Sequence, residues 1–525
     1  MLLYFNRVKF MKNKILCLLP LFALLATSCN GSSSSSTSSS SNNSSSSSSE
    51  GSIENKGVVQ IKDLSLLNRD LKNAYAPALG DVKMLVVPIA FAGDTAQGYE
   101  SKLNTWSSSK ISKIDSYYFA ENDSLASYYY TGSFGKLRIT GEVTDVYQNT
   151  DYSIKNILED DSMEVLRDLM DAAVNWLHDT DDSINWQQYD LNHDGCIDNI
   201  HFISNYNSTT WAENLWPHMF WTNRKGTIEK PMVNVYSMSC LSHMDGPITS
   251  IHEQGHIFGL DDYYDYSNNG QSSIDYIGGL DMQSMNMFDW NSYSKLSTGW
   301  VDPYVVDGSE DTAIVTLKAA SLNGDCLIIP ADYSSWNGSA FDEYFLIELF
   351  APFGNNVDDW NTYGYLLDNE TGVRMYHVDA RAFGSNKVDP DNNELLIVDD
   401  LDAQAINSKE DCGKWKYITR GANNCSNWRD YEGGIEQLGD HQLLTIIQKG
   451  GEFTFGDPSY SARHILSGED LFRTGDKFTF DKYSHFLNKS RKKQTAMNNG
   501  ETFPYEISFG KMTSDSIVVT INKVK

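Results

Sequence analysis

The sequence of 525 residues predicts an α+β protein with two folded regions. Up to Trp300, segments with the apolar spacing of a helix alternate with strand-like apolar runs. After Trp300 the chain consists mostly of short apolar runs separated by Gly, Asn and Asp, which is typical of a β-sandwich. One hydrophobic core rarely serves so long a chain. We therefore expect one domain over 57–300 and a β-sandwich region over 301–525.

The first 28 residues have the composition of a secretion signal. Four basic residues and no acidic residue precede an apolar run from Ile15 to Ala26, which is too short for a membrane span. Cys29 follows three small or polar residues, and these surroundings resemble the cleavage site of a bacterial lipoprotein. We predict a signal peptide over 1–28 and a lipid anchor on Cys29, which would attach the protein to the membrane. Secretion without an anchor is the alternative.

Residues 31–50 are almost entirely serine and asparagine. Because such a composition cannot bury a core, 29–56 is predicted to be a hydrated tether between the anchor and the folded regions. The formal net charge of the chain is −29, which disfavours nucleic acid as a partner and favours divalent cations. The expected location is the extracellular face of a bacterial cell membrane, or the medium if no lipid is attached.

Several elements follow from local patterns. Gly80 to Phe91 is an apolar run typical of a buried strand, a helix is expected over about 161–178, and a strand over 199–204. In the C-terminal region the clearest strands are expected at 313–317, 344–349, 373–378 and 516–521.

The loop at 190–198 matches the front of a calcium-binding loop. Oxygen-bearing side chains occupy its first, third, fifth and ninth positions, a glycine is sixth, and the seventh residue offers a backbone carbonyl. The predicted calcium ligands are Asp190, Asn192, Asp194, the backbone of Cys196, and Asp198. The twelfth position is His201 rather than glutamate, so another residue or water must complete the coordination shell. The alternative is a polar turn between the helix and the strand.

The strongest chemical signal is His-Glu-Gln-Gly-His at 252–256. Histidines four residues apart on a helix point the same way, so the imidazoles of His252 and His256 can reach one metal ion. Glu253 lies beside them as a proton acceptor. The spacing is typical of a zinc hydrolase, and the alternative is a helix with two buried, hydrogen-bonded histidines.

The helix that carries this motif is expected over about 247–258. Asp245 can cap its start, and Gly259 can end it in a left-handed conformation. Four residues keep near-helical spacing and should face the core. They are Ile248, Ile251, Gly255 and Phe258.

A catalytic zinc usually has three protein ligands and one position for water. A sharp turn at Gly259 would bring a residue three positions further on back to the metal, which favours Asp262 as the third ligand. Asp261 and Asp265 are close enough in sequence to be rivals.

The motif and three later blocks resemble the immune inhibitor A family of secreted bacterial metallopeptidases. The blocks are 252–262, Tyr264-Asp265, Gly278-Gly279-Leu280-Asp281-Met282, and Lys295-Leu296-Ser297-Thr298-Gly299-Trp300. Weaker matches extend the resemblance over most of the chain after residue 80. They are the strand-like run 80–91, a tyrosine-rich helix and strand over 124–143, and the block 215–218.

This resemblance implies a metzincin-like catalytic domain with an aspartate as third zinc ligand. It also implies a methionine turn beneath the zinc at Met282, with Met285 as the alternative. The family often has a second methionine where Gln283 stands here. The family also carries a loop similar to 190–198 just before a strand like 199–204. The resemblance therefore favours structural calcium over a plain turn.

We therefore expect a surface-anchored, zinc-dependent endopeptidase that hydrolyses extracellular proteins or peptides. Glu253 would be the general base for a zinc-activated water. A tyrosine can stabilise the oxyanion, and Tyr264, Tyr276 and Tyr293 are equal candidates by position. The alternatives are a surface adhesin on a catalytically vestigial peptidase fold, and a calcium-dependent glycan- or protein-binding lipoprotein.

Overall fold

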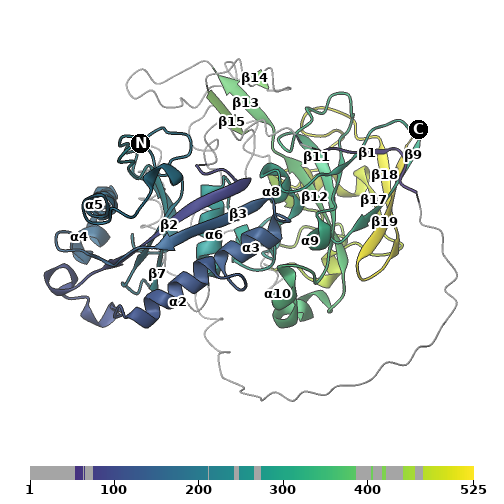
Figure 1. Ribbon diagram of the computed structural model, residues 1–525. Coiled ribbons are helices and arrows are strands. Elements are labelled where there is room, and N and C mark those ends of the chain that lie inside the picture. Colours follow the sequence, from purple (N-terminus) through teal and green to yellow (C-terminus); the bar gives the residue numbers. More distant parts are fainter. Residues whose placement is uncertain are drawn as a thin grey trace, which may run out of the picture.

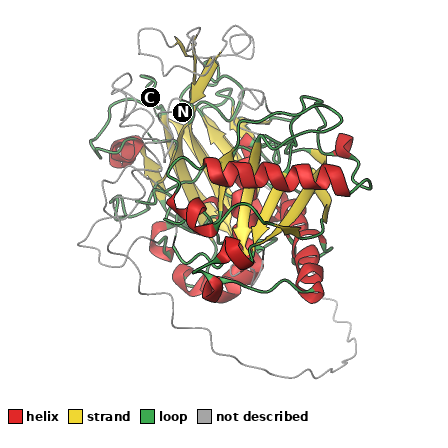
Figure 2. Ribbon diagram, turned by 90° about the vertical axis from the view of Figure 1, so that its left-hand side faces the viewer, coloured by secondary structure: helices red, strands yellow, loops and turns green. Residues whose placement is uncertain are grey.

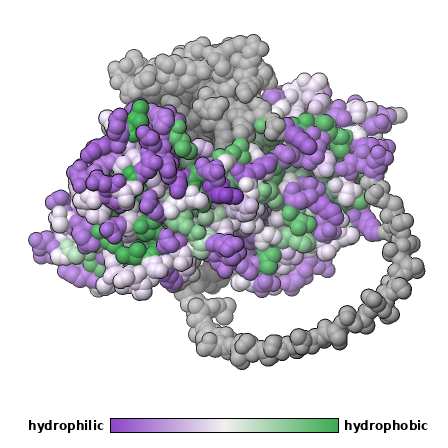
Figure 3. All heavy atoms as spheres, viewed as in Figure 1, coloured by the Kyte–Doolittle hydropathy of each residue, from purple (hydrophilic) through white to green (hydrophobic). Residues whose placement is uncertain are grey.

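The computed structural model describes residues 54–62, 64, 75–210, 212–241, 247–264, 274–385, 404–405, 417–420, 442–455 and 465–524. Figures 1 and 2 show a mixed arrangement of helices and strands, which confirms the predicted α+β class. Cys29, the signal segment and Asp245 lie outside the described residues. Within these residues no helix combines the length and the apolar character needed to cross a membrane. The face seen in Figure 3 is mostly hydrophilic, with smaller apolar areas between.

The first sheet belongs to the N-terminal region, drawn on the left in Figure 1. Its strand order is β3-β2-β5-β7-β6, with β4 also paired to β2. All of these pairings are parallel except that of β6 with β7, so the outer strand β6 is antiparallel to its neighbour. The strands are β2 (Gly80–Ala90), β3 (Leu137–Val143), β4 (Tyr147–Gln148), β5 (Ile200–Ser204), β6 (His218–Trp221) and β7 (Val235–Cys240).

Helices cover both faces of this sheet because β2 is buried on both sides. Met84 and Val86 pack in one core with side chains of α2, α3 and α6, whereas Leu85 and Val87 pack with side chains of α4 and α5. Successive residues of a strand point to opposite faces, which explains the alternation. The helices are α2 (Ser108–Phe119), α3 (Leu125–Gly132), α4 (Ile154–Glu159), α5 (Glu164–Thr180) and α6 (Ile248–Ile257).

Most predicted elements of this region are confirmed. The strand expected at 80–91 is β2, the helix expected at 161–178 is α5, and the strand expected at 199–204 is β5. The helix expected at 247–258 is α6. The predicted core face of α6 is right for Ile251 and Phe258 but wrong for Ile248, which is 40% exposed. Ile248 begins the helix at the surface, before its apolar stripe reaches the core.

Two further sheets form the C-terminal region, on the right in Figure 1. The larger has the order β1-β8-β10-β11-β12-β16 and the smaller β17-β18-β19-β9. The larger comprises β1 (Val58–Gln60), β8 (Tyr304–Val306), β10 (Leu327–Ile329), β11 (Glu343–Phe350), β12 (Gly372–Asp379) and β16 (Leu444–Ile446). The smaller comprises β9 (Thr312–Lys318), β17 (Lys477–Thr479), β18 (Tyr505–Met512) and β19 (Ser516–Lys523).

The two C-terminal sheets share an apolar core. Phe345 and Ile347 on β11 pack in the same cluster as Val315 on β9 and Val519 on β19. The four strands predicted here are confirmed as β9, β11, β12 and β19. The remaining strands and α-helices are those of a small sheet and several short helices. They are β13 (Ala382–Ser385), β14 (Gln404–Ala405), β15 (Tyr417–Arg420), α7 (Met282–Met285), α8 (Ser292–Ser297), α9 (Ala320–Asn323), α10 (Asn356–Tyr363) and α13 (Phe480–Tyr483).

A fourth apolar cluster, called the shared core here, contains side chains from both sides of residue 300. Tyr263 and Phe288 from the first side pack in it with Leu346 and Tyr376 from the larger C-terminal sheet. The N-terminal strand β1 also pairs with β8 in that sheet. The predicted boundary at residue 300 therefore falls between segments that pack against each other.

Candidate metal centre

Helix α6 carries the histidine motif and is held by tyrosines of two neighbouring helices. The hydroxyl of Tyr129 on α3 donates to the carbonyl oxygen of Ile251 at 2.7 Å. The hydroxyl of Tyr118 on α2 lies 2.7 Å from Ser250 Oγ. These bonds fix α6 against α2 and α3 at the turn that precedes the histidines.

The end of α6 reverses the chain toward the histidines. The N–H of Leu260 donates to the carbonyl of Gly255 and that of Gly259 to the carbonyl of His256, both at 3.0 Å. This is a Schellman motif, which requires a left-handed residue after the helix. Gly259 has φ +86°, as the sequence predicted. The reversal brings Asp262 back over the last turn of the helix.

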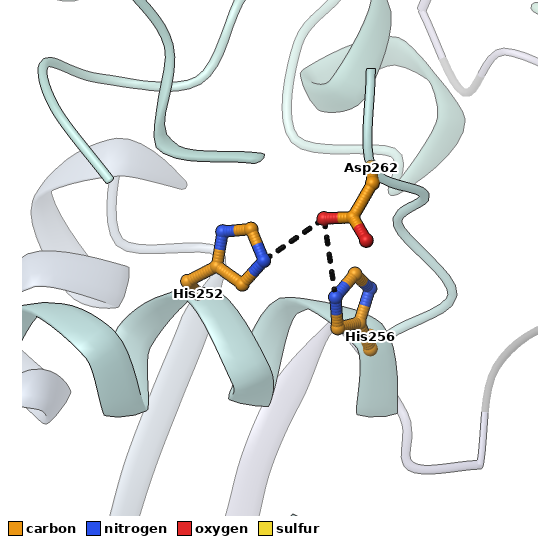
Figure 4. Close-up of side chains that lie close together, drawn as sticks. All are labelled: His252, His256 and Asp262. Carbon is orange, nitrogen blue, oxygen red and sulfur yellow. Dashed lines mark ion pairs between the residues drawn. The ribbon is translucent and has the colours of Figure 1, made fainter. Parts of the chain in front are cut away.

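Three side chains converge at this point (Figure 4). Asp262 Oδ1 lies 2.9 Å from His252 Nε2 and 3.5 Å from His256 Nε2. One ligand atom from each residue lies within 4.8 Å of the other two, and all three side chains are largely buried. Among the described residues, no other group of His, Cys, Asp or Glu meets this distance criterion. Asp261 is not part of the group, and Asp265 lies outside the described residues.

The other nitrogen of each ring sets its orientation. His252 Nδ1 lies 2.8 Å from the carbonyl oxygen of Met282, and His256 Nδ1 lies 2.7 Å from that of Leu260. Because a carbonyl only accepts, Nδ1 carries the proton in both rings. Each Nε2 is therefore the nitrogen that faces Asp262, and it becomes the donor to a metal ion when it loses its proton.

The carbonyl that orients His252 belongs to the predicted methionine turn. Met282 is fully buried in the same core as Ile251, whereas the alternative, Met285, is 42% exposed. The carboxylate of Asp281 caps this turn by accepting from the N–H of Gln283 at 2.8 Å. The turn thus places a buried methionine beside α6 and a backbone carbonyl that orients the ring of His252.

Gln283 fits against helix α6 because residue 255 is glycine. Its Nε2 donates to the carbonyl of His252 at 3.3 Å, and its Oε1 accepts from Trp290 Nε1 at 3.2 Å. A Cβ on Gly255 would lie 2.2 Å from Gln283 Oε1, which is well inside van der Waals contact. The glycine inside the motif is therefore needed for this close packing.

Burial and charge shift the pKa values of the site. Burial alone would lower the pKa of His256, but the charge and hydrogen bond of Asp262 raise it to about 10. Asp262 raises the pKa of His252 in the same way, and the two histidines lower the pKa of Asp262 in return. Burial raises the pKa of Glu253, with the histidine charges opposing. Without a metal ion, the two histidines therefore hold positive charge beside the negative Asp262, and a bound cation would take the place of their Nε2 protons.

Glu253 lies next to the outer strand of the first sheet. Its carboxylate accepts a hydrogen bond from the backbone N–H of Met219 on β6, and Glu253 is 8% exposed. It is not among the three grouped ligand residues. A buried carboxylate beside the ligands, with its pKa raised, suits a proton acceptor better than a metal ligand.

The predicted calcium loop folds as a tight turn before β5. Gly195 has φ +80°, and Asp190 accepts from the N–H groups of Asp194 and Gly195 at 3.0 and 2.9 Å. Asp198 is 8% exposed; burial first, then the charges of Asp190 and Asp194, raise its pKa to about 6. Asn192 and Asp194 are exposed. The three carboxylates do not form a group as compact as the histidine site.

The sequence did not point to the contacts that join this loop to helix α6. Asn199, the residue after Asp198, accepts from Gln254 Nε2 at 2.9 Å, and both amide residues are fully buried. His201 is also buried, with its ring nitrogens 2.8 and 2.9 Å from the hydroxyls of Ser237 and Ser239. His201 therefore belongs to the sheet interior rather than to the calcium loop.

The three candidate tyrosines differ in burial. Tyr293 is 1% exposed in the shared core, and Tyr276 is 5% exposed and packs against Phe453. Tyr264 is half-buried. The ring nitrogens of His218 lie 2.6 Å from the carbonyl oxygen of Trp216 and 3.2 Å from the hydroxyl of Tyr236, which indicates a structural role.

Comparisons with known proteins add no assignment. No protein-family model matches the chain, and no curated protein matches it in a sequence search.

Proposed function

We propose that this protein is a zinc-dependent endopeptidase. The observation that carries the proposal is the convergence of His252 Nε2, His256 Nε2 and an Asp262 oxygen within 4.8 Å of one another, beside Glu253. Two neutral imidazoles and a carboxylate are a common donor set for catalytic zinc, and three protein ligands leave one position for water or substrate.

The residues fit the proposed ion. Both histidines have their Nδ1 atoms engaged by backbone carbonyls, so their Nε2 atoms can bind zinc without a change of ring orientation. A bound zinc ion supplies Lewis acidity, which polarises a scissile carbonyl and acidifies water. Glu253 would take the proton of the attacking water and transfer it to the leaving amine, and its raised pKa suits this exchange.

The outer strand β6 supports an extended peptide as substrate. One edge of β6 pairs with β7, and Met219 on β6 contacts Glu253. An extended peptide can add to a sheet edge through main-chain hydrogen bonds. The resemblance of 252–262 to the immune inhibitor A family supports the same class of substrate. Tyr264, the one half-buried tyrosine of the three candidates, is our choice for the oxyanion.

We propose a metzincin-like domain over 57–300 and a β-sandwich region over 301–525. The two C-terminal sheets with one core between them support the sandwich. Calcium in the loop 190–198 is proposed as a structural ion, supported by the left-handed Gly195 and by the pKa of Asp198, which burial and then the charges of Asp190 and Asp194 raise. A lipid on Cys29 and a location outside the cell are proposed from the sequence alone.

A Glu253→Gln variant tests the proposal. We expect purified wild-type protein to bind one zinc ion per chain and to cleave casein. The variant should keep its zinc and lose activity by about 10²- to 10⁴-fold, the contribution of a general base. Zinc without casein cleavage in the wild type would favour a vestigial site on an adhesin or glycan-binding protein. Near-normal cleavage by Glu253→Gln would show that another group is the base.

A further inference from the structure

The turn that orients His252 contacts a buried ion pair of the C-terminal sheet. Arg374 on β12 and Glu348 on β11 are direct cross-strand partners, with Arg374 Nε 2.6 Å from Glu348 Oε1. Their side chains are 4% and 0% exposed. The guanidinium also lies over the ring of Phe350, 3.9 Å from its centre. The pair is therefore removed from water.

Both members of the pair reach across residue 300. Arg374 Nη1 donates to the carbonyl of Leu280 at 3.0 Å, two residues before the Met282 carbonyl that orients His252. Glu348 Oε2 accepts from the backbone N–H of Ser292 at 2.8 Å and from its hydroxyl. The pair thus holds both ends of segment 280–292.

A second buried pair on the same two strands provides a contrast. His377 Nε2 lies 2.9 Å from Glu343 Oε1, and both side chains are 0% exposed. Glu343 accepts further bonds from the backbone N–H groups of Asn498 and Asn499 in the C-terminal region. Side chains alternate along a strand, so this pair lies on the face toward the smaller C-terminal sheet.

Burying an ion pair costs desolvation that the attraction barely offsets, so such a pair does not by itself explain stability. Arginine can hold a carboxylate and a carbonyl at once because its donors form a rigid fork. We infer that Arg374 and Glu348 are positioning residues of the metal centre, which fix the turn carrying Met282 and thereby the ring of His252. This inference rests on the proposed zinc site and makes the C-terminal sheet part of that site.

Arg374→Lys tests the inference in the full-length protein. Lysine keeps a positive charge beside Glu348 but cannot also reach the Leu280 carbonyl as the fork does. The control is His377→Leu, which removes the nitrogen that contacts Glu343 and so breaks the other buried pair on the same strands. Zinc affinity is measured by competition with a chelator, and the urea midpoint of the metal-free protein reports stability. We expect Arg374→Lys to weaken zinc binding by about tenfold, the lower range for partners of metal ligands.

The control should lose stability but bind zinc with nearly wild-type affinity. Equal losses of zinc affinity in both variants, or unchanged affinity in a folded Arg374→Lys protein, would overturn the inference. If Arg374→Lys does not fold, Ser292→Ala replaces it, because it removes only the hydroxyl bond to Glu348. That variant should weaken zinc binding in the same direction by a smaller factor, and unchanged affinity would again overturn the inference. Failure of wild-type protein to bind zinc would instead remove the proposed function.

Discussion

Asp262 is the residue on which the proposed metal centre depends most. Its Oδ1 faces both Nε2 atoms, whereas the adjacent Asp261 is outside the group. A carboxylate in this place adds a negative charge to the site, which a third imidazole would not do. The left-handed turn at Gly259 reverses the chain, and after this reversal it is Asp262 rather than Asp261 that faces the histidines.

Asp262→Ala is expected to weaken zinc binding by more than about 100-fold. Loss of a residue that only hydrogen-bonds to a ligand costs up to about 100-fold, and loss of a ligand itself should cost more. Asp261→Ala changes the charge equally and should leave zinc affinity within a few-fold of wild type. The measurement is zinc content after dialysis, followed by chelator competition. If Asp261→Ala loses zinc and Asp262→Ala keeps it, the ligand is Asp261.

The convergence of His252, His256 and Asp262 could be predicted because their geometry is local. Histidines four residues apart share a helix face, and a glycine three residues later permits the reversal that returns Asp262. The contacts that support them have no such signature. Arg374 donates to Leu280 across 94 residues, and Gln254 donates to Asn199 across 55. These pairings depend on which strands are neighbours, and no sequence spacing encodes that.

At the scale of elements, the loop 190–198 and strand β5 form one unit with helix α6. The loop ends at Asp198, and the next residue, Asn199, contacts Gln254 in the motif. An ion that orders the loop would therefore also restrain the helix. The exposed start of α6 at Ile248 shows the limit of the periodic pattern, because a helix stripe is buried only where another element covers it.

Calcium is expected to raise the melting temperature of the protein, because an ion that binds only the folded loop stabilises it by mass action. At a calcium concentration about 100 times the Kd, the gain is about 2.7 kcal/mol. Asp194→Ala should reduce the rise, whereas Asp182→Ala, an exposed aspartate outside the loop, should not. The measurement is thermal unfolding with chelator and with calcium. If the protein is calcium-free at the start and its melting temperature does not change when calcium is added, the loop assignment is contradicted.

The buried His201 on β5 should make the sheet sensitive to acid. Burial lowers its pKa to about 3, against an ordinary value of 6.5. Between pH 6.5 and pH 3 the unfolded chain therefore binds a proton at His201 that the folded chain does not bind. The stability gained from the neutral, buried His201 is complete above pH 6.5 and is lost as the pH falls toward 3. His201→Gln can still bond to Ser237 and Ser239 but does not titrate.

The test is the urea midpoint of wild type and His201→Gln at pH 7.5 and pH 5. We expect wild type to lose more stability than the variant between these values. Because all other groups are common to both proteins, the difference isolates His201. An equal change in the two proteins would indicate that the histidine is not held neutral.

At the scale of the whole molecule, the shared core joins the two regions. Cys326 is fully buried in that core, and Cys240 is fully buried at the end of β7 in the first sheet. Phe288 from the first region packs with Phe350 and Trp360 of the second. A residue cannot leave such a core without exposing side chains of both regions.

We therefore expect Cys240 and Cys326 to become reactive at the same urea concentration. Both regions should unfold in one transition, since neither keeps its apolar surface covered alone. The measurement is thiol labelling along a urea series, with mass spectrometry of each cysteine peptide. Labelling of Cys326 well below the concentration that exposes Cys240 would mean that the C-terminal sheets open independently.

The position of strand β1 has a consequence for the order of events during synthesis. The side-chain amide of Gln60 donates to the carbonyl of Asp302, 242 residues later, next to the pairing of β1 with β8. A ribosome adds about 5 to 20 residues per second, so the first strand would wait about 10 to 50 s for its partner. The Arg374 that contacts the turn beneath His252 is translated later still. A nascent chain would thus carry His252, His256 and Asp262 before it has the scaffold that orients them, which would delay the proposed proteolytic activity until the chain is nearly finished.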